Sequence, residues 1–181
     1  YRALFDLAPI GYVVADSEGI IRQANQTFGN LLAMDAAALL AKPLGGLIHP
    51  DDGNLFTARF RAFYNDPPAR QIEVRMCKSD SGALHVRMEG RRMIDPVGPT
   101  ASQGDRAGHL LIAISDITRR ISAEQAIVRA KEQWEQTFDA VPDLVAIIDE
   151  QYTVVRVNMA LARRLGRTPQ ACVGQKCYHL L

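Results

Sequence analysis

Sulfur and imidazole side chains gather near the end of the sequence, where Cys172 and Cys177 are followed by His179. Thiolates and imidazoles are the usual ligands of zinc, so these residues could begin a metal site. Their spacing lacks a C-x-x-C pair, and the third cysteine, Cys77, lies far away in the sequence. We therefore expect no metal site.

Motifs that carry catalysis are also missing from the sequence. It contains no P-loop, no G-x-S-x-G nucleophile turn and no H-E-x-x-H metal-binding helix. A histidine-kinase phosphoacceptor would need a histidine on a helix, and the charged segment 119–140 has none. We therefore predict that this piece is not an enzyme.

Three phenylalanines, Phe56, Phe60 and Phe63, recur with helical spacing after the sequence His-Pro-Asp-Asp at 49–52. Proline and aspartate favour a helix start there, and the spacing puts the three rings on one side of that helix. Such a stripe could line a ligand cavity. Ordinary core packing is the simpler interpretation.

The composition is that of a globular protein with a real core. Hydrophobic residues make up 48% and charged residues 23% of the 181 residues. The net charge of +1 indicates neither a nucleic-acid surface nor an acidic tail. Three irregularly spaced cysteines and the lack of a membrane-spanning apolar run favour a reducing, cytoplasmic compartment. Since no initiator Met precedes Tyr1, we expect an excised piece of a parent that could be membrane-anchored.

A β-hairpin is expected near the start, with strands over 11–15 and 20–24. Asp16 opens the turn between them, and Gly19 is suited to the positive φ that such a turn requires. Asn25 follows the second strand and can cap the next helix with its side chain. We interpret Asp16, Gly19 and Asn25 as structural residues.

A second, longer hairpin is expected from alternation of apolar and polar residues over 72–77 and 84–89. Such alternation is typical of a sheet with one buried and one solvated face. A long loop rich in Pro and Gly is expected from Asp95 to Gly108. The strand after it, 110–114, is apolar on both faces, so we place it centrally in the sheet.

The segment Asp116-Ile117-Thr118 joins this central strand to a long exposed helix over 119–140, which contains neither Gly nor Pro. The side chains of Asp116 and Thr118 can both accept hydrogen bonds from the free N–H groups of the first helical turn. We expect this junction to transmit movement of the strand to the helix.

Apolar and small residues recur along that helix with spacings of three and four, close to the heptad repeat of a coiled coil. The centre of this seam is formed by Ile127, Ala130 and Trp134. A thin seam suits a helix that pairs with a second copy and can change register, so we expect a homodimer through this connector. The alternative is a helix that lies on its own domain.

The end of the sequence repeats its beginning with an offset of 133 residues. The matches are kept without a gap over the whole overlap. They include Phe5 with Phe138, Pro9 with Pro142, Asp16 with Asp149, Asn25 with Asn158, and Leu32 with Leu165. We therefore predict a second, incomplete copy of the first domain, with about two of its five strands.

In their order and spacing, these elements resemble the PAS/PAC sensor domains of bacterial signalling proteins. The resemblance covers residues 1–118 fully and 134–181 in part, with the connector helix at 119–140. It implies an α+β fold, whose five-stranded antiparallel sheet has the order 2-1-5-4-3 and carries short helices on one face. It also implies a sensory role, in which Asp116, Ile117 and Thr118 mark the strand-to-helix junction. We expect the parent to be a sensor histidine kinase of a two-component system, and the alternative output is a cyclic-dinucleotide enzyme.

Departures from the family bear on the cofactor. Flavin photoreceptors of the family carry Asn-Cys-Arg-Phe before the helix that corresponds to the phenylalanine helix. Residues 45–50 here read Gly-Gly-Leu-Ile-His-Pro, so a cysteinyl photoadduct is excluded. Haem-sensing members use a histidine on that helix, and residues 52–64 contain none. Haem is therefore disfavoured, and the cofactor stays unknown.

Three functions follow from the resemblance. The favoured one is a module that senses a small ligand or redox cue and passes the signal through its C-terminal helix to an output domain. The alternative is a ligand-free dimerisation scaffold, and a flavin-binding redox sensor ranks below it. A ligand would lie between the sheet and the phenylalanine helix, lined by Phe56, Phe60, Phe63, Val74, Met88 and Ile112. Neither nucleic acid nor membrane is an expected partner of this segment.

Overall fold

The structure is a computed structural model that describes residues 2–80, 82–93 and 108–180. The chain divides into two compact units, Tyr1–Ile121 and Ser122–Leu181, and the division falls inside a helix. The loop expected from Asp95 to Gly108 lies, except for Gly108, outside the described residues.

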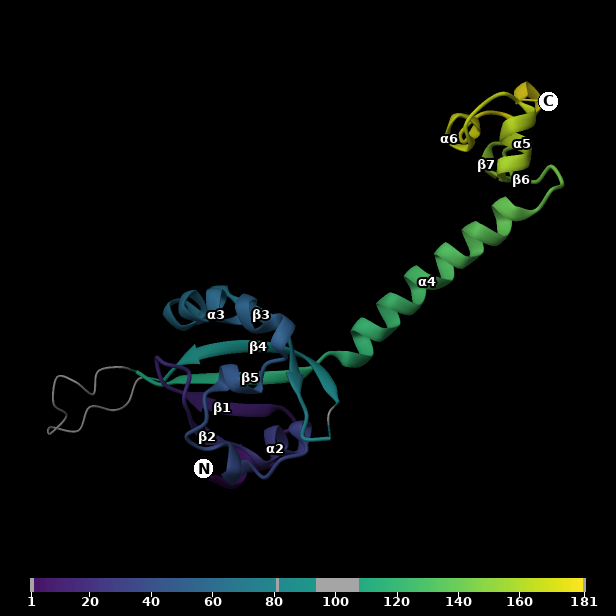
Figure 1. Ribbon diagram of the computed structural model, residues 1–181. Coiled ribbons are helices and arrows are strands. Elements are labelled where there is room, and N and C mark those ends of the chain that lie inside the picture. The colour runs from purple at the N-terminus through teal and green to yellow at the C-terminus, as the bar shows by residue number, and fades with distance from the viewer. Residues whose placement is uncertain (1, 81, 94–107, 181) are drawn as a thin grey trace, which may run out of the picture. The chain divides into compact units, whose positions relative to one another are not determined.

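The first unit is built on one antiparallel sheet with the strand order β2-β1-β5-β4-β3, which confirms the predicted order. Figure 1 shows β5 running between β1 and β4. The strands are β1 (Gly11–Ala15), β2 (Ile21–Ala24), β3 (Gln71–Cys77), β4 (Ala83–Arg92) and β5 (Leu110–Asp116).

The period of two in the sequence determines which side chains this sheet buries. On β5, Leu110, Ile112 and Ile114 are fully buried, while the intervening residues are half-buried, as expected for a central strand. The β3–β4 hairpin pairs apolar residues directly across its strands, and all of them face the core. These pairs are Ile72 with Met88, Val74 with Val86, and Met76 with Leu84.

Helices within residues 26–65 cover the inner face of this sheet, and their buried apolar residues join the same core cluster as the strands. Residues 36–39 form a 3-10 helix, because Ala38 and Leu40 donate to carbonyls three residues back. The helices of the unit are α1 (Arg2–Asp6), α2 (Gln26–Leu32), η1 (Ala36–Leu39), η2 (Leu44–Leu47), α3 (Pro50–Asn65) and η3 (Pro67–Ala69).

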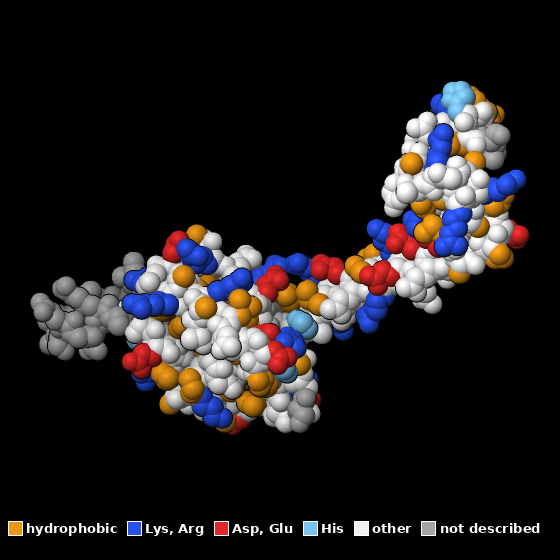
Figure 2. Space-filling view, turned by 45° about the horizontal axis from the view of Figure 1, so that its top comes forward, with side chains coloured by type: hydrophobic (Ala, Val, Ile, Leu, Met, Phe, Trp, Pro, Cys, Tyr) orange, Lys and Arg blue, Asp and Glu red, His pale blue; other side chains and the backbone are white. Residues whose placement is uncertain are grey.

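The helix α4 (Thr118–Ala140) begins in the first unit and continues into the second. Its 23 residues include no buried side chain, and Figure 2 shows charged side chains of both signs along it. The second unit then adds β6 (Ala146–Ile148), β7 (Val154–Val157), α5 (Met159–Arg164), α6 (Pro169–Cys172) and α7 (Cys177–Leu180).

The second unit repeats the hydrogen bonding of the first hairpin. Asn158 accepts hydrogen bonds from the amides of Val145 and Leu161, and Asn25 accepts from the amides 133 residues earlier, those of Tyr12 and Phe28. A small core forms beneath it, with Cys172 fully buried and Cys177 packed at its edge. The sequence repeat is therefore a structural repeat.

Candidate functional site

The junction between β5 and α4 is held by three hydrogen bonds that involve consecutive residues. Asp116 Oδ1 accepts from the amide of Thr118 at 2.8 Å, so its carboxylate caps the helix start. The amide of Ile117 donates to the carbonyl of His85 on β4 at 2.9 Å. The hydroxyl oxygen of Thr118 accepts from the amide of the same residue, His85, at 3.0 Å.

Thr118 thus differs from the expectation that both junction side chains would cap α4. Its side chain reaches across to β4 because β4 and β5 remain paired up to Val86 and Asp116, which puts the amide of His85 beside the first helical residue. The first turn of α4 is therefore bonded to two strands, β5 through Asp116 and β4 through His85. Ile117 is buried at this point.

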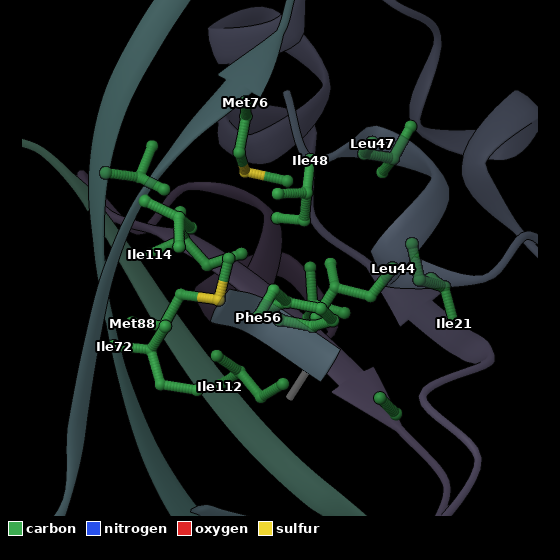
Figure 3. Packing of buried hydrophobic residues seen from close by; sticks show 14 of the residues in the cluster. Ile21, Leu44, Leu47, Ile48, Phe56, Ile72, Met76, Met88, Ile112 and Ile114 are labelled. Carbon is green, nitrogen blue, oxygen red and sulfur yellow. The ribbon is translucent and has the colours of Figure 1, made fainter. Parts of the chain in front are cut away.

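The six candidate pocket residues share one interior region between α3 and the sheet. All of them are buried and belong to the same core cluster. Figure 3 shows Phe56 pointing into the interior where Ile72, Met88 and Ile112 also lie. The six residues are Phe56, Phe60, Phe63, Val74, Met88 and Ile112.

Aromatic rings fill much of that interior. The ring centroids of Phe56 and Phe60 lie 5.1 Å apart, and those of Phe60 and Phe63 lie 6.4 Å apart. A Cβ built on Gly19 would lie 3.2 Å from the Phe60 ring, so this glycine serves both the turn and the packing. Its φ of 78° is the conformation expected for that position. The three rings can thus act as core packing, and Phe63 also lines a surface cavity of about 480 Å³.

An ion-pair network fastens the start of α3 to β3, and sequence reasoning did not find it. Arg75 donates to both carboxylate oxygens of Asp52 and to Asp51, and its backbone amide donates to Asp52 Oδ2 at 2.7 Å. These bonds from the Arg75 side chain and amide lower the pKa of Asp52 to about 2. The amide of His49 completes the link by donating to the Arg75 carbonyl.

The three residues interpreted as structural each organise the backbone. Partial burial alone would raise the pKa of Asp16, but hydrogen bonds from the amides of Ile20 and Glu18 and from Arg22 hold this pKa below its usual value. Gly19 provides the turn described above. Asn25 is fully buried and donates to the carbonyls of Phe5 and Ile10 while accepting from two amides.

The candidate seam of α4 is open to solvent within this chain. Ile127 is 71% exposed, Trp134 is 47% exposed, and Ala130 is also exposed. Trp134 already has neighbours in its own chain, since its ring stacks on Phe138 and lies under the guanidinium of Arg156. Ile127 and Ala130 are therefore the seam residues most available to a second molecule.

No group of three or more His, Cys, Asp or Glu side chains in residues 2–80, 82–93 and 108–180 is placed to hold a metal ion. Within those ranges, no helix combines the length and the apolar character needed to cross a membrane.

Comparison with known proteins gives one consistent fold. A family profile described as PAS fold matches residues 1–102, and a second profile with the same description matches residues 138–181. A search of curated proteins found no match.

Solved structures agree with this assignment. The PAS domain of an HTR-like protein from Haloarcula marismortui is 21% identical, with a TM-score of 0.50 over 64% of this chain and 88% of that one. A PAS domain from a two-component sensor histidine kinase is 10% identical, with a TM-score of 0.52 over 64% and 91% of the two chains. A LOV protein from Rhodobacter sphaeroides is 19% identical, with a TM-score of 0.52 over 70% and 69%. At these identities, the likeness shows the fold.

Proposed function

Because the chain belongs to the PAS fold family, we propose that it is a sensory module that detects a small ligand or redox cue in its first unit. The signal passes through α4 to an output domain, which we expect to be a histidine kinase. One observation carries this proposal: the first turn of α4 is hydrogen-bonded to two different strands of the sensor sheet.

A change between the sheet and α3 would reach α4 by a short route. Met88, a candidate pocket residue, and His85, which holds Thr118, lie on the same strand, β4. A ligand that shifts β4 against β5 must therefore stretch or break the bond from His85 to Thr118. Ligand binding would bias the helix start through the difference in affinity for the two arrangements.

Substitution at the junction tests this transmission. Thr118→Val keeps the shape of the side chain but removes the oxygen that accepts from His85. In the full-length protein, we expect this variant to fold and to lose most of its response to the stimulus. The matched control is Thr137→Val, because the Thr137 hydroxyl donates within α4, to the carbonyl of Gln133. A normal response in Thr118→Val would contradict the proposal.

A second candidate function is a ligand-free dimerisation scaffold, and the packing of Phe56, Phe60 and Phe63 favours it. Mass spectrometry of small molecules released from the denatured protein, together with its absorbance spectrum, separates the candidates. A released ligand supports sensing, a yellow flavin spectrum supports the redox sensor, and neither signal supports the scaffold.

For either candidate, we propose that two copies pair through α4. Exposed apolar side chains at Ile127 and Val128, which are 71% and 55% exposed, support this pairing. Burying them against a second copy would remove apolar surface from water.

A further inference from the structure

The guanidinium of Arg156 on β7 packs against side chains in the last turns of α4. Its Cζ lies 4.6 Å from the centroid of the Trp134 ring and 5.5 Å from that of Phe138. The two rings stack on each other with centroids 5.2 Å apart and an interplanar angle of 18°. Arg156 Nη1 lies 3.1 Å from Oε1 of Glu135. We call these four residues the arginine clamp.

The clamp lies next to the centre of the second unit. Arg156 pairs with Ile147 of β6, and the next residue, Val157, is buried in the small core. Asn158 follows directly, and its side chain bonds backbone groups of the segment before β6 and the amide of Leu161 on α5. A displacement of Arg156 therefore acts at once on the strand pair, on the core and on this buried asparagine.

The first unit shows that the fold does not require the clamp. Gln23 occupies the position equivalent to Arg156, 133 residues earlier, and makes no ring or ion-pair contact among the described residues. There, Phe5 of α1 stacks instead on Tyr12 of β1, with the ring centroids 6.0 Å apart. The clamp is thus an addition to the unit that α4 enters.

The geometry of the clamp is sensitive to rotation of α4. Trp134 and Phe138 lie one helical turn apart, and Glu135 lies beside them, so all three hold Arg156 from the same side of the helix. Side chains reach about 5–6 Å from a helix axis, so a rotation of roughly 30° moves them by about 3 Å. That displacement is enough to break the bond between Glu135 and Arg156 and to move the guanidinium off the rings.

We propose that the arginine clamp is the receiving contact of the signalling helix, with Arg156 as its positioning residue. Rotation that begins at Thr118 is converted by Arg156 into a change in the packing of β7. The inference rests on the proposed function, since the movement of α4 that the clamp would detect starts at the junction with the sheet.

Trp134 can serve as an intrinsic fluorescence probe of the clamp, because it is the one tryptophan of the sequence. We would measure quenching of Trp134 fluorescence by acrylamide in the whole 181-residue protein. Arg156→Gln installs the residue of the first unit, and we expect the quenching constant to rise by roughly a factor of two as the ring is uncovered. Arg156→Lys keeps the charge but loses the planar stacking, so an intermediate value is expected. The matched control, Arg163→Gln, removes the same charge from an exposed position on α5.

The double variant Thr118→Val with Arg156→Gln distinguishes a failure of the clamp proposal from a failure of the proposed function. Thr118→Val alone should change the quenching of Trp134, and it should add no further change in the presence of Arg156→Gln. If Thr118→Val changes the quenching of Trp134 equally with Arg156 and with Arg156→Gln, the clamp is not the receiving contact. Transmission along α4 would still hold in that case. Quenching that Arg156→Gln does not alter would also overturn it. No effect of Thr118→Val on Trp134 in the intact chain would overturn both this inference and the proposed transmission.

Discussion

Two fully buried polar residues, Asn25 and Asn158, organise the two units at the scale of single side chains. Each uses its complete hydrogen-bonding capacity, with two bonds accepted by the oxygen and two donated by the nitrogen. Each thereby joins the segment before a strand, the strand itself and the helix that follows. Such a residue fixes a chain crossing that apolar packing alone would leave loose.

Asn25→Ala should therefore destabilise the first unit strongly. The substitution leaves the amides of Tyr12 and Phe28 and the carbonyls of Phe5 and Ile10 without these partners, and we expect a loss of about 3 kcal/mol. Urea unfolding followed by circular dichroism measures it. Asn30→Ala is the control, because Asn30 is exposed and its side chain accepts from the side chain of Gln26 on the same helix. A similar, small loss in both variants would show that Asn25 is dispensable.

Backbone conformation follows the repeat as closely as these hydrogen bonds do. Three equivalent pairs of positions have positive φ, and in each pair one member is glycine and the other is not. The pairs are Gly19 with Tyr152, Ala33 with Gly166, and Ala41 with Gly174. The left-handed conformation is thus a property of the fold, which the non-glycine residues adopt at a cost.

Ala33→Gly should raise stability for this reason. Ala33 ends α2 with a φ of 55°, and relief of the Cβ contact should outweigh the added chain entropy by about 0.5–1 kcal/mol. The midpoint of urea unfolding should increase. Ala38→Gly should lower it, because Ala38 lies within the right-handed 3-10 helix η1. A fall in stability for Ala33→Gly would argue against strain at this position.

Sequence reasoning succeeded where a local pattern decides the structure. The alternation over 72–77 and 84–89 was enough to predict the long hairpin. The offset of 133 was enough to predict a second copy of the first, shorter hairpin, which the structure shows as β6 and β7. Sequence reasoning did not assign a positive φ to Tyr152, because a tyrosine disfavours this conformation, although the Tyr152 amide closes the same turn, by donating to the Asp149 carbonyl, as Gly19 does in the first unit. The arginine clamp could not be predicted from the sequence either, since it depends on how α4 packs on β7.

At the scale of elements, the bond between α3 and β3 shows the same limit. Asp52 and Arg75 are separated by 23 residues, and their contact depends on the position of the helix start relative to the third strand. From the sequence, Asp52 was a helix-starting residue and Arg75 one of several outward charges. In the structure, they provide the polar link at one end of the helix that covers the candidate pocket.

Acid should break this link over a defined range of pH. The pKa of Asp52 is about 2 in the folded protein and near 3.8 when unperturbed. Because the folded value is the lower one, the stabilisation is present above about pH 4 and is lost as pH falls towards 2. After allowance for solvent screening, it amounts to about 1 kcal/mol. Asp52→Asn should flatten this part of the stability curve, measured by urea unfolding between pH 2 and 5. An unchanged slope in Asp52→Asn would assign the acid sensitivity to other carboxylates.

At the scale of the whole molecule, one continuous helix belongs to both units. Its first turn is bonded to the sheet of the first unit, and its last turns carry the arginine clamp of the second. Between them, 119–133 contain no buried side chain. A helix fixed at its ends and bare in the middle suits pairing with a second copy, in which the middle supplies the interface.

Ile127→Glu tests that pairing directly. Ile127 is the largest exposed apolar residue of the bare stretch, and two copies of a glutamate there would place like charges in a seam that excludes water. We expect the dimer dissociation constant, from sedimentation equilibrium of the whole chain, to rise by about tenfold or more. Gln125→Glu adds the same charge two residues away, on a different side of the helix, and should leave the dimer intact. If the unsubstituted protein stays monomeric at every concentration, or if both variants dissociate equally, then α4 connects the two units without being an interface between molecules.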